Sequence, residues 1–286
     1  MKFGADVLQP ASSPPPQTLR FRGRLRLDPD AQAIISAVGT ASGVSVTTAQ
    51  KKAIQAFIRA EKVANRWTKL KRFYLPIWSN AAANAVDWIT RTSGTWVGSV
   101  NHEAGYVQGD GSTGYLNTGL SPTAAGMSAT SALLGALRTE AFGSGTLIGS
   151  MGPSVTLPVR STEAGGSHYF DFTNFVGGRL TNADLDAVPG IITCRALGSA
   201  LTSRARNSTG IVASTTATAG AMSGVNSNAI YVLGENNNGT LANPCSDRVG
   251  AAFFGTGMTD TDDAAFTLNL KTLWETLTGQ QLPPVA

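Results

Sequence analysis

The sequence changes pattern at Pro76, and the part that follows most constrains the fold of this chain. Beyond Pro76, short apolar or alternating runs are separated by turn-forming stretches of Gly, Asn, Asp and Ser. The runs lie at residues 85–89, 95–97, 146–148, 168–172, 191–194, 230–233 and 251–254, and the separators include 109–112, 165–167 and 236–239. Runs at this spacing are typical of an antiparallel β-sandwich or barrel, so we predict a mainly β fold.

One helix is predicted at the end of this β region. Thr259 and the three nearby aspartates offer an N-cap and negative charge at a helix start. An apolar stripe follows at helical spacing, and Gly279 ends it. The stripe consists of Phe266, Leu270, Leu273 and Leu277. We therefore expect residues 77–286 to form one domain, a β-sandwich capped by a C-terminal helix.

The first 27 residues have a different character. Residues 9–16 contain four prolines, which fix φ and remove backbone donors, so this stretch is expected to be an extended arm. From Thr18, apolar residues alternate with arginines, which predicts a strand with one basic face. That face carries Arg20, Arg22, Arg24 and Arg26.

Residues 28–76 are predicted to be a basic helical segment. Asp28 and Pro29 start a first helix, and Thr47 with Gln50 forms a capping box for a second. The apolar pattern restarts at Trp67 and predicts further helix to about residue 74. Residues 1–75 carry a net charge of +9, whereas residues 76–286 carry −5. We expect the basic part to dock on an acidic neighbour, because arginine side chains bind carboxylates well at protein interfaces. Non-specific binding to DNA phosphates is the less favoured alternative.

The order of several short motifs resembles virion structural proteins of tailed bacteriophages that are built on a concanavalin A-like (laminin-G-like) jelly roll. The matching stretches are DPDAQA at 28–33, WTKL at 67–70, GDGSTGYLNTG at 109–119, NAIYVLG at 228–234 and AFFGTGMTD at 252–260. The resemblance implies a jelly-roll sandwich and a structural role in a tail fibre, a tail-associated part or a head decoration. It further implies assembly into virions in the host cytoplasm, with homo-oligomeric or repeated copies and other virion proteins as partners of the N-terminal segment.

Binding of a host-surface glycan is the alternative function. A sugar site needs an exposed aromatic side chain beside polar side chains, on loops held by a rigid sandwich. The candidates of this kind are Trp96, Tyr106, Tyr169, Asn236 and Asn237. Aromatic residues in alternating runs also suit a core, and both interpretations stay open here.

Enzymatic and metal chemistry have little support in the sequence. Jelly-roll glycosidases need two carboxylates at a defined separation, and no Glu-x-Asp-x-Glu triplet occurs. The acidic cluster at 260–263 suffices as a helix cap, and zinc-type Cys/His spacing is absent. We therefore predict no enzyme, no metal and no cofactor.

No run in the sequence approaches the roughly 18–20 apolar residues of a membrane span. The two cysteines, Cys194 and Cys245, are expected to be reduced, structural thiols.

Overall fold

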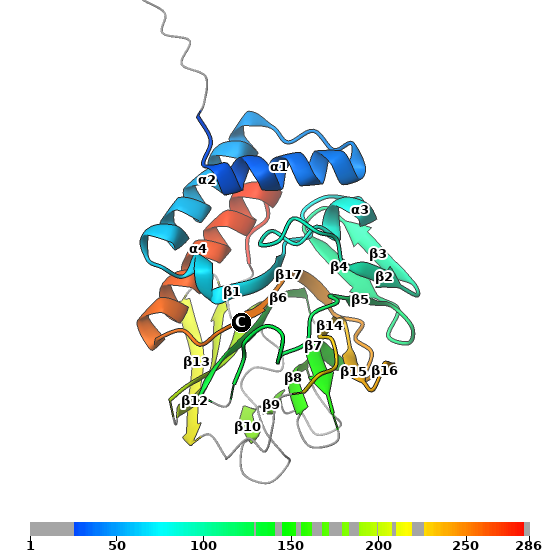
Figure 1. The fold of residues 1–286 in the computed structure, drawn as a ribbon, viewed down its shortest axis with the longest axis vertical. Coiled ribbons are helices and arrows are strands. Elements are labelled where there is room, and N and C mark those ends of the chain that lie inside the picture. The colour runs from blue at the N-terminus through cyan, green and yellow to red at the C-terminus, as the bar shows by residue number, and fades with distance from the viewer. Residues whose placement is uncertain are drawn as a thin grey trace, which may run out of the picture.

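The computed structural model describes residues 26–128, 130–140, 145–152, 156–161, 168–171, 179–182, 189–198, 200–207, 210–218 and 226–282. Within these ranges two β-sheets face each other, and helices cover the outer side of one of them (Figure 1). The predicted fold class, a mainly β sandwich with N-terminal helices and a C-terminal helix, is confirmed.

The first sheet has eight strands, and every pair in it is antiparallel. Its order is β13 (Gly210–Thr218), β12 (Ala200–Asn207), β11 (Gly190–Leu197), β6 (Ser131–Glu140), β17 (Arg248–Gly255), β4 (Tyr106–Gly109) and β3 (Val100–Glu103). The eighth strand, β1 (Leu70–Tyr74), pairs with the last residues of β17. Strands distant in sequence thus meet at β17, which lies near the middle of the molecule.

The second sheet has nine strands and packs on the inner face of the first. Its order is β10 (Arg179–Asn182), β9 (His168–Asp171), β8 (Thr156–Ser161), β7 (Gly145–Met151), β14 (Tyr231–Val232), β5 (Tyr115–Asn117) and β2 (Thr95–Val97). A hairpin of β15 (Glu235–Asn237) and β16 (Thr240–Ala242) joins β7 through β15, in the one parallel pairing among the described strands. Leu134, Leu147, Ile148 and Phe254 belong to the core between the sheets.

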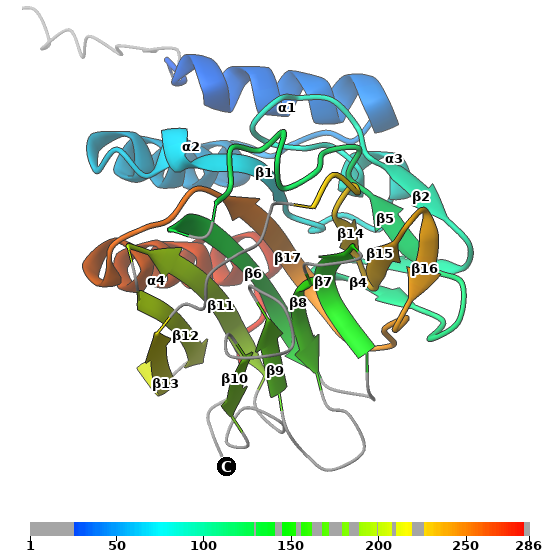
Figure 2. The same ribbon diagram turned by 60° about the horizontal axis from the view of Figure 1, so that its bottom comes forward.

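A layer of helices covers the outer face of the first sheet. It contains α1 (Pro29–Ser42), α2 (Thr48–Val63) and α4 (Asp260–Thr278), which lie on the same side of β6, β11 and β17 in Figures 1 and 2. Among the described residues, a short helix, α3 (Ala81–Asn84), and a 3-10 turn, η1 (Trp67–Lys69), complete the helical elements.

Four phenylalanines join the helices to the sheet. Phe57 of α2, Phe73 of β1, Phe253 of β17 and Phe266 of α4 form a cluster with ring-centroid separations of 4.9 to 6.4 Å. Since successive strand residues point to opposite faces, Phe253 enters this cluster while Phe254 enters the core between the sheets.

The sequence-based helix over residues 67–74 is wrong. Only η1 is helical there, and β1 pairs in register with β17, for example Phe73 with Phe253. Residues 70–74 form a strand and not a helix because the strand buries Leu70 and Phe73 and hydrogen-bonds to the edge of β17. Arg26 and Leu27, the described part of the predicted Arg-striped strand, likewise belong to no strand. The basic segment 28–76 therefore shares a hydrophobic core with β17 and α4.

We expect Phe266→Ala to lower the free energy of unfolding by about 3–5 kcal/mol, because the substitution leaves a cavity among the four phenylalanines. Urea denaturation followed by tryptophan fluorescence measures the change. Leu268→Ala is the matched control on the same helix, since Leu268 is 48% exposed, and it should shift stability by only about 0.5 kcal/mol. Equal effects of the two substitutions would contradict this account of the helix layer.

Candidate functional site

A polar pocket of about 240 Å³ lies at the β3–β4 edge of the first sheet. It is lined by Ser99, Asn101, Gln108, Gly109 and Asp110. Asn101 and Gln108 are direct partners in the β3–β4 pairing, so their side chains share one face. Val107, which directly precedes Gln108 in β4, is buried between the sheets, so Asn101 and Gln108 lie on the outer face of the first sheet.

The carboxylate of Asp110 organises the loop beside this pocket. It accepts hydrogen bonds from the Thr113 hydroxyl at 2.6 Å and from the amides of Ser112, Thr113 and Gly114 at 2.9, 2.6 and 2.9 Å. The Thr113 hydroxyl and these amides hold the pKa of Asp110 well below its usual range. The pocket therefore contains a negative charge at neutral pH.

Two glycines let this loop pack closely on its neighbours. A Cβ atom at Gly109 would lie 2.5 Å from the carbonyl oxygen of Cys245, and one at Gly114 would lie 2.0 Å from that of Ser99. Only glycine permits such close backbone approach, so the Gly-rich stretch 109–114 has a packing role. The loop that carries Asp110 is thus fixed against the sheet.

The amide side chains of the pocket keep part of their hydrogen-bonding capacity. Gln108 Nε2 donates to the carbonyl oxygen of Ser246 at 2.9 Å, which orients the side chain. Among the described residues, no donor contacts Gln108 Oε1, and the exposed side chain of Asn101 has no hydrogen-bond partner. The pocket therefore offers a free amide at Asn101 and a carbonyl acceptor at Gln108 beside the Asp110 carboxylate.

Tyr106 borders this pocket on the same face of β4 as Gln108. The guanidinium of Arg248 lies 4.7 Å from the centroid of the Tyr106 ring, within the range of a cation–π contact. Arg248 is also the cross-strand partner of Gln108 and forms an ion pair with Glu140. An aromatic and charged surface thus adjoins the polar pocket.

The structure does not bring the other predicted glycan residues to this site. Trp96 packs edge-on against His102 at 4.7 Å between ring centroids and donates from Nε1 to the carbonyl oxygen of Ala81. Asn236 is buried and bonds within its own hairpin region, whereas Asn237 is exposed at the end of β15 in the second sheet. The side chain of Tyr169 lies outside the described residues.

The alternation of β3 and β4 could have pointed to Asn101 and Gln108, but their pairing register could not be read from the sequence. In the strand β5, Tyr115 does not face the core between the sheets. Leu116 points inward, and the Tyr115 ring stacks on Tyr231 at 4.3 Å with an interplanar angle of 26°.

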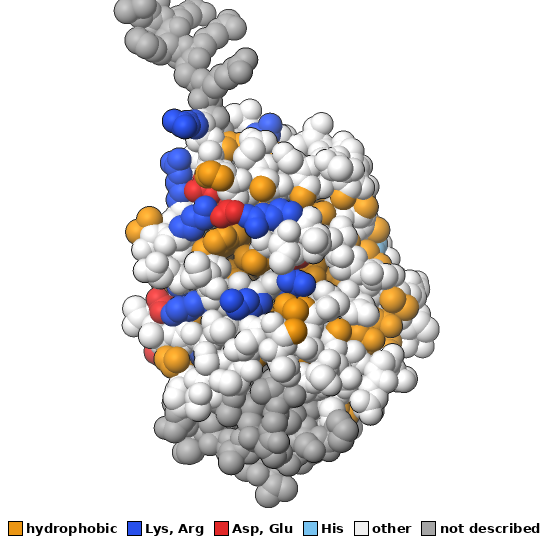
Figure 3. All heavy atoms as spheres, viewed as in Figure 1, with side chains coloured by type: hydrophobic (Ala, Val, Ile, Leu, Met, Phe, Trp, Pro, Cys, Tyr) orange, Lys and Arg blue, Asp and Glu red, His pale blue; other side chains and the backbone are white. Residues whose placement is uncertain are grey.

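The predicted docking arginines are only partly within the described chain. Arg20, Arg22 and Arg24 lie outside the described residues, and Arg26 is exposed just before α1. Figure 3 shows Lys and Arg side chains gathered over α2 and β1 and beside the start of α1. Docking through the four arginines stays a prediction.

Among the residues that the structure describes, no group of three or more His, Cys, Asp or Glu side chains is arranged to hold a metal ion. Within the same ranges, every helix is too short or too polar to cross a membrane.

No family model and no curated protein sequence matches this chain. Among solved structures, it is similar to Trypanosoma rangeli sialidase in complex with sialic acid, with a TM-score of 0.49 and 9% identity over 76% of this chain and 38% of the sialidase. Domain 4 of AbnA, a GH43 arabinanase from Geobacillus stearothermophilus in complex with arabinotriose, gives a TM-score of 0.44 and 12% identity over 70% of this chain and 98% of that domain.

A third similar structure is the CBM40 of the Ruminococcus gnavus IT-sialidase bound to α2,3 sialyllactose. Its TM-score is 0.39, with 14% identity over 62% of this chain and 96% of the module. All three TM-scores lie below 0.5, and this chain spans well under half of the sialidase. The function proposed below therefore rests on the residues of this chain.

We expect the Asp110 carboxyl to titrate well below about pH 3.9, the ordinary midpoint for aspartate, because its charged form accepts four hydrogen bonds. Folding lowers this pKa, so the loop gains stability above about pH 4 and loses it as the pH falls through the folded-state pKa. A carbon-13 NMR titration measures the midpoint. Thr113→Val removes the hydroxyl but keeps the backbone amides, so this substitution should raise the titration midpoint of Asp110. An unshifted midpoint in the parent protein would contradict the proposed loop geometry.

Proposed function

We propose that this protein binds a glycan in the polar pocket between β3, β4 and the Asp110 loop. The observation that carries the proposal is the combination of Asn101 and Gln108, which keep hydrogen-bonding capacity, with the ionised Asp110. A sugar hydroxyl is both donor and acceptor, so it can bond the Asn101 amide and the Gln108 carbonyl oxygen, with the negative charge of Asp110 beside them.

The surroundings of the pocket support this proposal. The pocket lies on paired strands and on a loop whose amides donate to the Asp110 carboxylate, so its polar groups are positioned before a ligand arrives. The adjoining Tyr106, half-buried with the Arg248 guanidinium over its ring, would give a ligand longer than one sugar ring a mixed aromatic and charged surface to contact. The pocket volume of about 240 Å³ suits one small polar unit, with the rest of the chain lying outside.

For the biological setting we propose a structural component of a phage particle that displays this pocket, as the sequence resemblance implies. The arrangement of the helices is compatible with an N-terminal anchor in such a particle. In both ribbon views α1 begins on the side where α2 and α4 lie, away from the β3–β4 hairpin (Figures 1 and 2). An anchor that precedes α1 would thus leave the pocket accessible.

Purified protein should bind glycans on an array of neutral and sialylated oligosaccharides, and calorimetry with the strongest binder gives the affinity. Asn101→Ala and Gln108→Ala should each weaken binding by about 0.5–1.5 kcal/mol, the usual contribution of one hydrogen bond. Asn237→Ala is the matched control, because Asn237 is exposed on the other sheet. Absence of any bound glycan, or equal loss in the control, would refute the proposed site.

We also propose that binding occurs without catalysis. Glycoside hydrolysis uses a pair of carboxylates in most families, and Asp110 is the single carboxylate among the residues that line the pocket. Its low pKa makes it unsuited to act as a general acid at neutral pH. A reducing-sugar assay on the bound oligosaccharide should show no release over the uncatalysed rate. Release that Asp110→Asn abolishes would overturn this proposal.

A further inference from the structure

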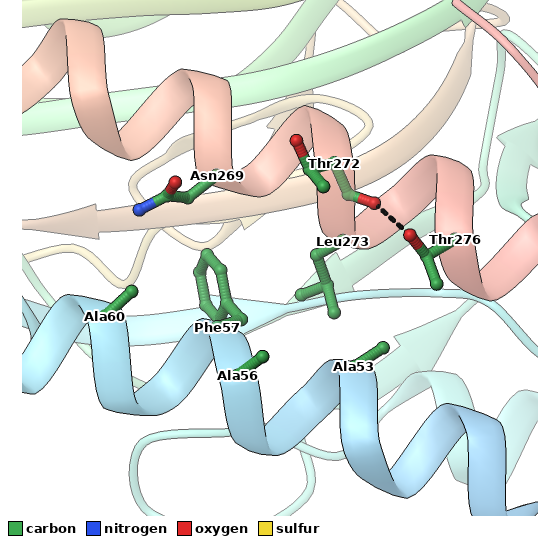
Figure 4. Close-up of a pocket in the computed structure, with 8 residues that line it drawn as sticks. All are labelled: Ala53, Ala56, Phe57, Ala60, Asn269, Thr272, Leu273 and Thr276. Atoms are coloured by element: carbon green, nitrogen blue, oxygen red, sulfur yellow. Dashed lines mark hydrogen bonds between the residues drawn. The ribbon is translucent and has the colours of Figure 1, made fainter.

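An open groove runs between α2 and α4 on the outside of the helix layer (Figure 4). Its volume is about 330 Å³, and its walls are mainly apolar. The α2 side consists of Ala53, Ala56, Phe57 and Ala60, and the α4 side of Asn269, Thr272, Leu273 and Thr276. Figure 4 shows these side chains projecting from the two helices toward the gap between them.

The groove forms because the side chains of α2 that face α4 at this point are alanines, which are too small to fill the space between the helices. Phe57 and Leu273 are buried beneath it and hold the helices together, while the three alanines leave the space above them unfilled. Ala53 and Ala60 are two turns apart, so the groove is about 10 Å long at 1.5 Å per residue. That length matches two turns of a third helix, and alanine lets helix backbones approach closely.

Exposed apolar side chains adjoin one end of the groove. Asn269 Nδ2 donates to Glu61 Oε1 at 2.6 Å, which places the last turn of α2 beside this part of α4. Val63 and Leu268 flank that contact in sequence, and they are 86% and 48% exposed. Large apolar side chains left in water beside an apolar groove indicate an interaction surface.

The two rims of the groove differ in charge. Lys52 and Arg59 are exposed on α2, seven residues apart and thus on one stripe next to Ala56. Neither has a carboxylate partner among the described residues. The α4 residues that line the opposite rim are uncharged and offer the hydroxyls of Thr272 and Thr276 and the amide of Asn269.

We propose that the α2–α4 groove binds an amphipathic helix of a partner protein, with acidic residues along one flank of its apolar stripe. The apolar stripe would cover Ala56 and Leu273, and the acidic flank would face Lys52 and Arg59. The Arg-rich residues 18–25 of this chain would bring like charge to the same rim, and a second copy would set basic α2 against basic α2. Charge complementarity therefore favours an acidic partner helix.

The test uses the full chain and two fluorescein-labelled amphipathic peptides. Both have the same leucine stripe on an alanine background, with glutamates on one flank in the first and lysines in the second. Fluorescence anisotropy at physiological salt should show that the glutamate peptide binds and the lysine peptide does not. Equal binding of the two peptides, or binding of neither, would overturn the proposal.

Three variants locate the binding. Ala56→Trp fills the groove and should lower the affinity for the glutamate peptide by about tenfold or more. A tenfold loss corresponds to roughly 1.4 kcal/mol. Lys52→Glu with Arg59→Glu should reverse the preference toward the lysine peptide. Lys71→Glu, on β1, is the charge control and should leave binding unchanged, and thermal unfolding checks that each variant is folded.

Two outcomes would assign the groove to another occupant and refute the proposal. Self-association of the parent protein in sedimentation velocity, abolished by Ala56→Trp, would assign it to a second copy. Peptide binding that arises only after deletion of residues 1–25 would assign it to the N-terminal segment of this chain.

Discussion

The fold depends on β17 having both of its faces buried. Phe253 packs into the cluster with Phe57, Phe73 and Phe266 on the helix side, and Phe254 packs into the core between the sheets. The neighbouring strand β6 leaves room for this arrangement at Gly135, where a Cβ atom would lie 2.3 Å from the Phe253 ring. Any shift of β17 by one residue would exchange the two cores, so this strand sets the register of the strands and helices that pack on it.

Buried arginines then align α4 on the first sheet. Arg195 of β11 donates to the carbonyl oxygen of Met258 at 2.9 Å and pairs with Asp260 at the start of the helix. Arg206 of β12 donates to the Thr267 hydroxyl at 3.0 Å, about two turns further along. Guanidinium groups can reach several acceptors at once, so these contacts fix the position of the helix along the strands. The phenylalanine cluster thus provides the apolar contact between α4 and the sheet, and the arginines set the position of α4 along the strands.

The sequence alone is sufficient to predict those elements whose ends are determined by residues within the element. The capping box of Thr47 and Gln50 and the N-cap at Thr259 both form as expected, and alternation revealed the β class. The strand at residues 70–74 could not be predicted, because its partner lies almost two hundred residues away in β17. The candidate site shows the same limit. Aromatic residues suggested a sugar site, yet Trp96 is packed on His102, and the pocket depends on the register that pairs Asn101 with Gln108.

The position of the pocket follows from where the helix layer ends. Trp274 Nε1 donates to the carbonyl oxygen of Gly105 at 2.8 Å, and Gln280 Nε2 donates to that of Ala104 at 3.1 Å, so the last turn of α4 stops at the β3–β4 turn. A side chain at Gly105 would come within 3.1 Å of Thr278, which keeps this contact close. Beyond it, none of the described helices covers the outward-facing residues of the hairpin, and Asn101 is exposed. Asn101 and Gln108 lie in that uncovered part, on the same sheet face that the helices bury elsewhere. The same helix that completes the core therefore also determines which part of the sheet stays uncovered.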